Sequence, residues 1–171
     1  TNCKLDIYTF ENRNINYNIK AIVDIVDIRN SFEIARELNL HITNNKMLRA
    51  YSWYRKGLNS DNTLDKFLAF WNSISVISDA YCNDNDRTKK GIINRIWDCF
   101  IQVWEENSNW PLIGGNEDWV NDHNEIRNQI AHGGMTVDIE YINNILDKIQ
   151  NLEKVNYRFL KDFSHRIGIQ I

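Results

Sequence analysis

The stretch that decides the fold is residues 64–81, LDKFLAFWNSISVISDAY. Apolar side chains recur in it at steps of three and four residues, the period of an amphipathic helix, for about five turns. They are Leu64, Phe67, Leu68, Trp71, Ile74, Ile77 and Tyr81. Asp61 or Thr63 can cap the start of this helix. We therefore expect a long helix at the centre of a hydrophobic core.

The same period extends to both sides of this stretch. Residues 47–58 form a preceding amphipathic helix, which Gly57 helps to close. Three more helices are predicted after the central one, joined by short polar segments. The first runs from residue 92 until Trp110 and Pro111, the second over about 116–132 and the third over about 138–166. Four to five helices connected in this way form an antiparallel bundle, which we assign to residues 44–171.

The composition fits one mainly all-α domain. The 171 residues are 43% hydrophobic and 25% charged, which is a globular balance, and one Pro with seven Gly is too few for the turns of an all-β fold. The net charge of -3 excludes the overall basic field that most nucleic-acid binders carry. Any site for a polyanion is therefore small and local.

Residues 1–43 are predicted to be a small extension that precedes the bundle. Residues 4–10 and 19–25 alternate loosely between apolar and polar, as in a short hairpin, and residues 30–38 resemble a short helix. This strand-containing segment is either an extension of the bundle or the remnant of an upstream domain. The chain starts with Thr rather than Met, so we expect it to be processed or part of a longer protein.

Cysteine usage and hydropathy indicate a reducing compartment. The three cysteines, Cys3, Cys82 and Cys99, include no close pair and have no His or Cys at metal-ligand spacing, so we expect neither a disulfide scaffold nor a metal site. No window offers the roughly 18 to 20 apolar residues of a membrane span, and no signal peptide opens the chain. The expected location is the cytoplasm, without membrane contact.

One segment, EIRNQIAHGG at residues 125–134, combines residue types that perform chemistry. It places an arginine, an amide and a histidine beside a flexible Gly-Gly pair. Together with the bundle, it resembles the HEPN family, whose signature is Arg, a polar residue, a few more residues and then His. Arg127, Asn128 and His132 match that signature. The resemblance spans roughly residues 47–163.

A wider pattern is similar to the Apea-like branch of the HEPN family. It consists of YRKGL at residues 54–58 followed by the aromatic FLAFW at residues 67–71. One position departs from the family, because Ser75 stands in the second core helix where relatives often carry an acid. If that acid assists catalysis or positions Arg127, the departure puts activity in doubt.

The resemblance implies a metal-independent endoribonuclease that needs no cofactor and acts as a toxin or antiviral-defence effector under an antitoxin or regulatory partner. Cleavage of RNA by its own 2'-hydroxyl requires a proton acceptor, a proton donor and positive charge on the phosphorane. His132 supplies the general base or acid, because an imidazole titrates near neutrality. Arg127 holds the phosphate oxygens, and Asn128 orients the ribose or the histidine.

Helical geometry restricts how this site forms. At about 100° per residue, Arg127 and His132 lie about 140° apart on a continuous helix. Either the helix opens near Ala131, or the cleft is shared by two subunits that each supply one pair. The resemblance favours the shared cleft, so we expect a homodimer. His123, four residues before Arg127 on nearly the same face, is a supporting partner or a purely structural histidine.

Weaker candidates for RNA contact lie elsewhere in the chain. Arg87, Lys89 and Lys90 form a small basic cluster that could touch phosphates, although it is also an ordinary solvated helix start. Most of the six tryptophans fall at core positions, whereas Trp53 and Trp110 are the ones to consider for base stacking.

A purely structural role for Arg127 and His132 and a rival function both stay open. Arg127 could be a solvated charge next to Glu125 or Asp122, and His132 could simply cap a helix end. The rival function is a catalytically inactive HEPN bundle that serves for dimerisation or for sensing a nucleotide or other ligand, within a larger protein. Ser75 and the acidic net charge favour it.

Overall fold

The computed structural model describes residues 33, 36, 44–132 and 139–168. Over these residues the chain forms five α-helices and two short 3-10 helices, and no strand. They are α2 (Asn44–Asn59), α3 (Thr63–Tyr81), η2 (Thr88–Lys90), α4 (Ile92–Trp104), η3 (Asn107–Asn109), α5 (Trp119–His132) and α6 (Ile139–Arg166). The predicted all-α class with four to five helices is confirmed. The hairpin predicted within residues 1–43 lies outside the described residues, as does the Gly133-Gly134 turn. Of the short helix predicted over residues 30–38, only Glu33 and Arg36 are described, and both are helical.

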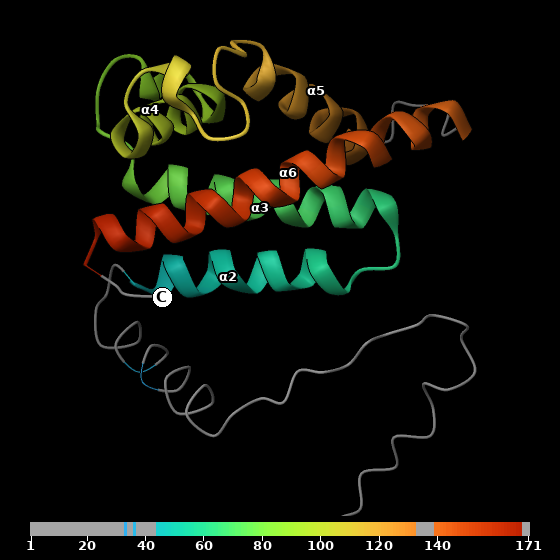
Figure 1. Ribbon diagram of the computed structural model, residues 1–171, viewed down its shortest axis with the longest axis horizontal. Helices are drawn as coiled ribbons and strands as arrows, with labels where there is room; N and C mark the ends of the chain where they lie inside the picture. Colours follow the sequence, from blue (N-terminus) through green and yellow to red (C-terminus); the bar gives the residue numbers. More distant parts are fainter. Residues whose placement is uncertain (1–32, 34–35, 37–43, 133–138, 169–171) are drawn as a thin grey trace, which may run out of the picture.

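Helix α3 is the centre of the bundle, as its apolar pattern predicts. It packs against each of α2, α4, α5 and α6. Figure 1 shows α2 and α6 running along α3, with α4 and α5 together on the side away from α2. Its side chains Phe67, Phe70 and Trp71 are almost fully buried.

Helices α2 and α3 approach closely at Gly57, which does not close α2 as predicted. The helix continues to Asn59, and a Cβ at Gly57 would lie 2.6 Å from Cε1 of Phe70. The glycine therefore makes room for the Phe70 ring. The cap of α3 also differs from the prediction, because Asn62 accepts the Leu64 amide at 2.9 Å in place of a cap by Asp61 or Thr63.

A buried polar cluster joins α2, α3 and α6. The Ser73 hydroxyl donates to the carbonyl of Ala50 at 2.8 Å and lies 3.2 Å from Oδ1 of Asn156. The amide of Asn156 in turn donates to the Phe70 carbonyl at 2.9 Å. Both polar side chains are fully buried, so these bonds offset the cost of removing them from water and fix how the three helices align.

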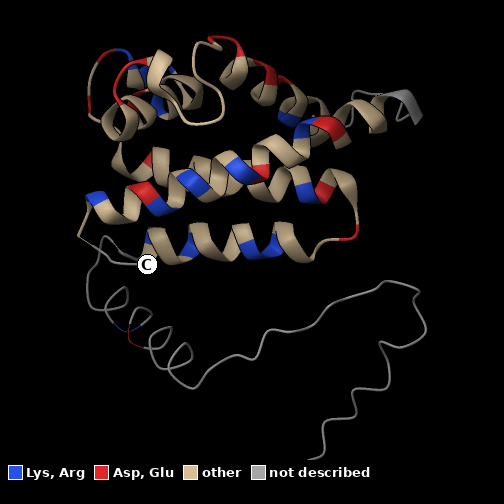
Figure 2. Cartoon of the chain, in the orientation of Figure 1, with Lys and Arg blue, Asp and Glu red and all other residues tan. Residues whose placement is uncertain are grey.

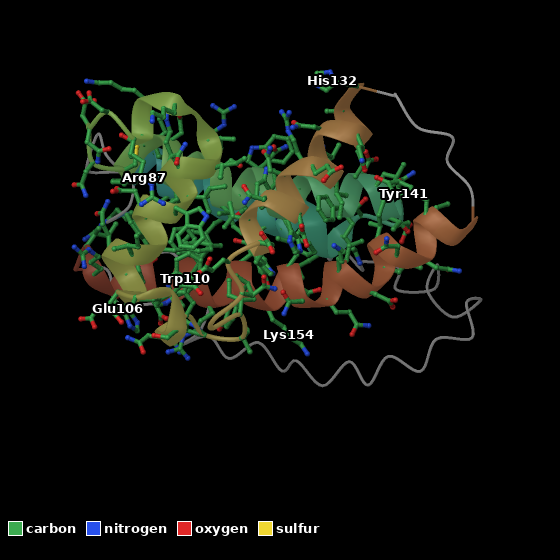
Figure 3. The ribbon with its side chains drawn as sticks, turned by 90° about the horizontal axis from the view of Figure 1, so that it is seen from above. Arg87, Glu106, Trp110, His132, Tyr141 and Lys154 are labelled. Carbon is green, nitrogen blue, oxygen red and sulfur yellow. The ribbon has the colours of Figure 1, made fainter. Side chains whose placement is uncertain are left out.

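An aromatic cluster lies where α4 packs against α6. The Phe100 ring lies 4.8 Å from Trp104, 5.1 Å from Trp110 and 4.9 Å from Phe159. Trp110 is only 2% exposed, so the hypothesis that it stacks on bases is wrong (Figure 3). Helix α4 also ends at Trp104, earlier than predicted, and the segment after it folds Trp110 back onto the core.

No helix within the described part of the chain has the length and apolar character needed to cross a bilayer.

Candidate functional site

The candidate site lies on α5, which the core holds by one face. Trp119, Val120, His123 and Ile126 of this helix are buried. The indole N–H of Trp119 also donates to Oδ1 of Asn151 on α6 at 2.7 Å, which fixes the start of α5. Arg127 and Asn128 follow the buried face and are half-buried, whereas His132 is exposed.

Arg127 and Asn128 form a hydrogen-bonded pair. The Nη1 atom of Arg127 donates to Oδ1 of Asn128 at 2.9 Å. Arg127 makes no ion pair with a described carboxylate. Asp122 is instead 3.7 Å from the Lys148 ammonium, and Glu125 accepts from Gln129 at 3.2 Å. The other donors of the guanidinium therefore remain available for an anion.

His132 is the last residue of α5 and lies at the exposed end of the helix (Figure 3). The helix is continuous through Ala131, so it does not open before His132. On such a helix the directions of Arg127 and His132 differ by about 140°. One chain therefore does not direct both side chains to the same side of α5.

His123 occupies a buried aromatic environment. It is 4% exposed, its ring stacks on Trp119 at 4.1 Å, and its Nδ1 lies 2.7 Å from the Trp119 carbonyl. Burial lowers its pKa from 6.5 to about 4. At neutral pH the ring is uncharged, so Nδ1 donates to the carbonyl and Nε2 has no partner among the described residues. This geometry is that of a structural histidine.

The lowered pKa of His123 makes the stability of the protein depend on pH. The unfolded chain takes up a proton near pH 6.5 and the folded chain only near pH 4, so stability falls as pH falls through this window. We expect the wild type to lose about 2 kcal/mol more unfolding free energy than His123→Phe between pH 7 and pH 5. Urea unfolding of both proteins at the two pH values measures this difference. Equal losses would contradict a neutral buried His123.

Ser75 lies away from Arg127, in a groove between α2 and α3. Its hydroxyl donates to the Trp71 carbonyl of its own helix at 2.9 Å. The described residues that line this groove come from α2, α3 and α4, and none comes from α5. The structure therefore does not bring Ser75 together with the pair on α5 in one chain.

The basic cluster predicted at Arg87, Lys89 and Lys90 lies at η2, between α3 and α4. The Arg87 guanidinium is 5.7 Å from the centre of the Trp97 ring, and Lys89 pairs with Asp84 at 3.5 Å. Figure 3 shows Arg87 and His132 well apart in the molecule. These residues do not join the Arg127 site within one chain, and acids compensate part of their charge.

Sequence reasoning missed the basic character of α2. Lys46, Arg49 and Trp53 of α2 line the groove opposite Ser75, and we call this feature the α2 groove. The signal was present, because residues 44–59 contain four Lys or Arg and no Asp or Glu. The net charge of the whole chain conceals it.

Metal ligands do not gather anywhere in the described residues, which contain no group of three or more His, Cys, Asp and Glu side chains able to hold an ion.

Comparison with known proteins yields one family. A family model described as methylamine utilization protein MauJ matches residues 50–159, which include α3, α4, α5 and most of α6. No curated protein and no solved structure matches the chain.

Proposed function

We propose that this chain, which belongs to the MauJ family, is a metal-independent endoribonuclease of the HEPN type that acts as a toxin or antiviral-defence effector. The observation that carries the proposal is the arrangement on α5. Arg127 is held by Asn128 and has no carboxylate partner among the described residues, and the exposed His132 ends the same helix. An anion-binding guanidinium and an accessible imidazole are the groups that this chemistry needs.

Each residue has one role in the proposed reaction. The guanidinium of Arg127 binds the scissile phosphate and stabilises the charge of the phosphorane. The imidazole of His132 transfers one of the two protons: it either accepts the proton of the attacking 2'-hydroxyl, with water protonating the leaving 5'-oxygen, or protonates the 5'-oxygen, with water accepting the 2'-hydroxyl proton. Asn128 fixes the direction of the guanidinium through the 2.9 Å bond. The products are a 2',3'-cyclic phosphate and a 5'-hydroxyl.

The proposed enzyme is a homodimer. Because α5 is continuous, Arg127 and His132 of one chain diverge by about 140°. Two chains packed around a twofold axis place the arginine of one next to the histidine of the other. The cleft then holds two equivalent Arg–His pairs, each made of Arg127 from one subunit and His132 from the other.

The family supports this proposal. MauJ is a helical, HEPN-like family, and the Arg-Asn…His signature of Arg127, Asn128 and His132 resembles that of HEPN ribonucleases, with a wider similarity to the Apea-like branch. An enzyme of this kind acts on cytoplasmic RNA, and an antitoxin or regulatory partner restrains it until its trigger appears.

A cleavage assay tests the proposed function. We expect the purified protein to cut mixed cellular RNA in excess chelator, because no step uses a metal ion. The fragments should end in 2',3'-cyclic phosphate and 5'-hydroxyl groups, which end-specific labelling detects. Intact RNA, or cleavage that the chelator stops, would contradict the proposal.

One observation favours the rival function of ligand sensing. A pocket of about 460 Å³ lies between α5 and α6, lined by His123, Asp122 and Asn151 among others. His123 there carries a buried Nε2 without a partner among the described residues. If RNA stays intact, a rise in melting temperature with added nucleotides would support this function instead.

A further inference from the structure

Helix α2 is strongly basic in a chain of net charge -3. It carries Lys46, Arg49, Arg55 and Lys56 and no acidic residue. All four cations are exposed, and none forms an ion pair with a described carboxylate. Figure 2 shows blue bands and no red along this helix. The charge separation leaves α2 complementary to a polyanion.

Two of these cations line one wall of the α2 groove. Lys46, Arg49 and Trp53 follow one another at steps of three and four residues, so they share one face of α2. Asn72 and Ser75 of α3 supply uncharged polar groups on the opposite wall, and the groove encloses about 420 Å³. Its single lining acid, among the described residues, is Asp79.

The negative charge of Asp79 is compensated. Its carboxylate forms an ion pair with Arg95 of α4. Lys46 and Arg49 therefore set the local charge of the groove, which stays positive over its α2 wall. A phosphate entering from this side meets two free cations.

Trp53 adds an aromatic surface to the basic face. Its indole is half-buried, so packing holds it while part of the ring reaches solvent. The Lys56 ammonium lies 4.9 Å from the ring centre. Lys56 is exposed on a flexible stem, so it can move from the ring to a phosphate while a base takes its place. Aromatic rings between cations are the usual arrangement for single-stranded nucleic acids, since an unpaired base offers a free face.

We propose that the α2 groove binds a single-stranded tract of RNA, with Lys46, Arg49 and Lys56 on its phosphates and Trp53 stacked on a base. The choice of RNA rests on the proposed function, whereas the groove itself lies outside the α5 site. Asn72 and Ser75 face the tract with groups that hydrogen-bond to ribose hydroxyls or base edges. The groove thus holds RNA at a distance from the bond that is cut.

Binding of a labelled oligouridine RNA, followed by fluorescence anisotropy, tests this proposal. The chain carries His132→Ala throughout, so that the probe stays intact. We expect Lys46→Glu with Arg49→Glu to weaken binding at least tenfold. Replacing Arg49 alone by Gln should lower the salt dependence of log K by about 0.7, the value for one phosphate contact with a single strand.

The stacking contact is tested at Trp53. The variant Trp53→Ala should weaken binding about tenfold, since the stacking of one base on an aromatic ring contributes on that scale. Trp53→Phe keeps an aromatic face and should retain most of the affinity. Equal losses in the two variants would contradict stacking.

Arg55→Glu is the matched control. Arg55 lies on the same helix but is turned by about 120° from Arg49, away from the groove. It should change affinity by no more than about twofold. A loss of affinity equal to that of the Lys46/Arg49 variant would mean that binding depends only on the overall charge of α2, and it would overturn the proposal. Preferential binding of duplex RNA or of an acidic peptide would overturn it as well.

The outcomes separate this inference from the proposed function. If the wild type leaves RNA intact but the groove variants still lose binding, RNA binding by the α2 groove is supported and the endoribonuclease activity is contradicted. If the wild type cuts RNA and the groove variants bind RNA as tightly as their His132→Ala parent, the proposed groove is wrong and the endoribonuclease is unaffected. Melting curves of each variant serve as the check on folding, and we expect them to match the parent because the substitutions are all at exposed or half-buried positions.

Discussion

Two inactive variants are expected to restore activity when they share a dimer. Arg127→Ala and His132→Ala should each lower RNA cleavage at least about 100-fold, because general acid–base catalysis and charge stabilisation each contribute on that scale. A heterodimer of the two keeps one arginine from one subunit and one histidine from the other. It therefore retains one of the two Arg–His combinations and should recover about half of the wild-type rate.

The heterodimer is obtained by co-expressing the two variants with different affinity tags and purifying on both. The two homodimeric variants, prepared in the same way, provide the background rate. Recovery excludes a site within one chain, since no subunit then holds both residues. A heterodimer as inactive as its parents would contradict the shared cleft and return both groups to a single chain.

The second large effect concerns the aromatic cluster. Phe100→Ala should lower the unfolding free energy by about 3–5 kcal/mol, because the ring is fully buried against Trp104, Trp110 and Phe159 and its loss leaves a cavity. For a chain of this size the melting temperature should fall by about 10 °C. Thermal unfolding followed by circular dichroism measures the shift.

Ile101→Ala, at the next position of α4, is the control for that substitution. Ile101 is 42% exposed, so its truncation removes little buried area and should cost less than about 1 kcal/mol. The comparison distinguishes burial in the cluster from loss of helix propensity. Similar shifts in both variants would mean that Phe100 does not anchor α4 in the core.

The helical fold was largely predictable from the sequence, because apolar spacing reports one face of each helix. The pattern from Leu64 to Tyr81 predicted the central helix, and the structure packs α3 against four others. Details that depend on neighbours were not predictable. Gly57 was interpreted as a terminator, whereas its role is to accommodate Phe70 across the helix interface. Trp110 lies outside any helix, so periodicity gave no information on its burial.

The candidate site was predictable only in part. The sequence supplies Arg127, Asn128 and His132, but it did not show whether the helix opens near Ala131. The structure settles that point, since α5 continues to His132. The hydrogen bond from Arg127 to Asn128, and the pairing of Asp122 with Lys148, depend on side-chain positions that spacing does not specify. The basic face of α2 is not visible in the net charge of -3, because acidic residues elsewhere in the chain outnumber its four cations.

The most direct test of the proposed endoribonuclease compares the ends of RNA fragments made in excess chelator by the wild type, His132→Ala and His165→Ala. His165 is a matched control, because it is also an exposed histidine in the last turn of a helix. We expect cyclic-phosphate ends with the wild type and with His165→Ala, and none with His132→Ala. Equal cleavage by His132→Ala and the wild type would contradict it.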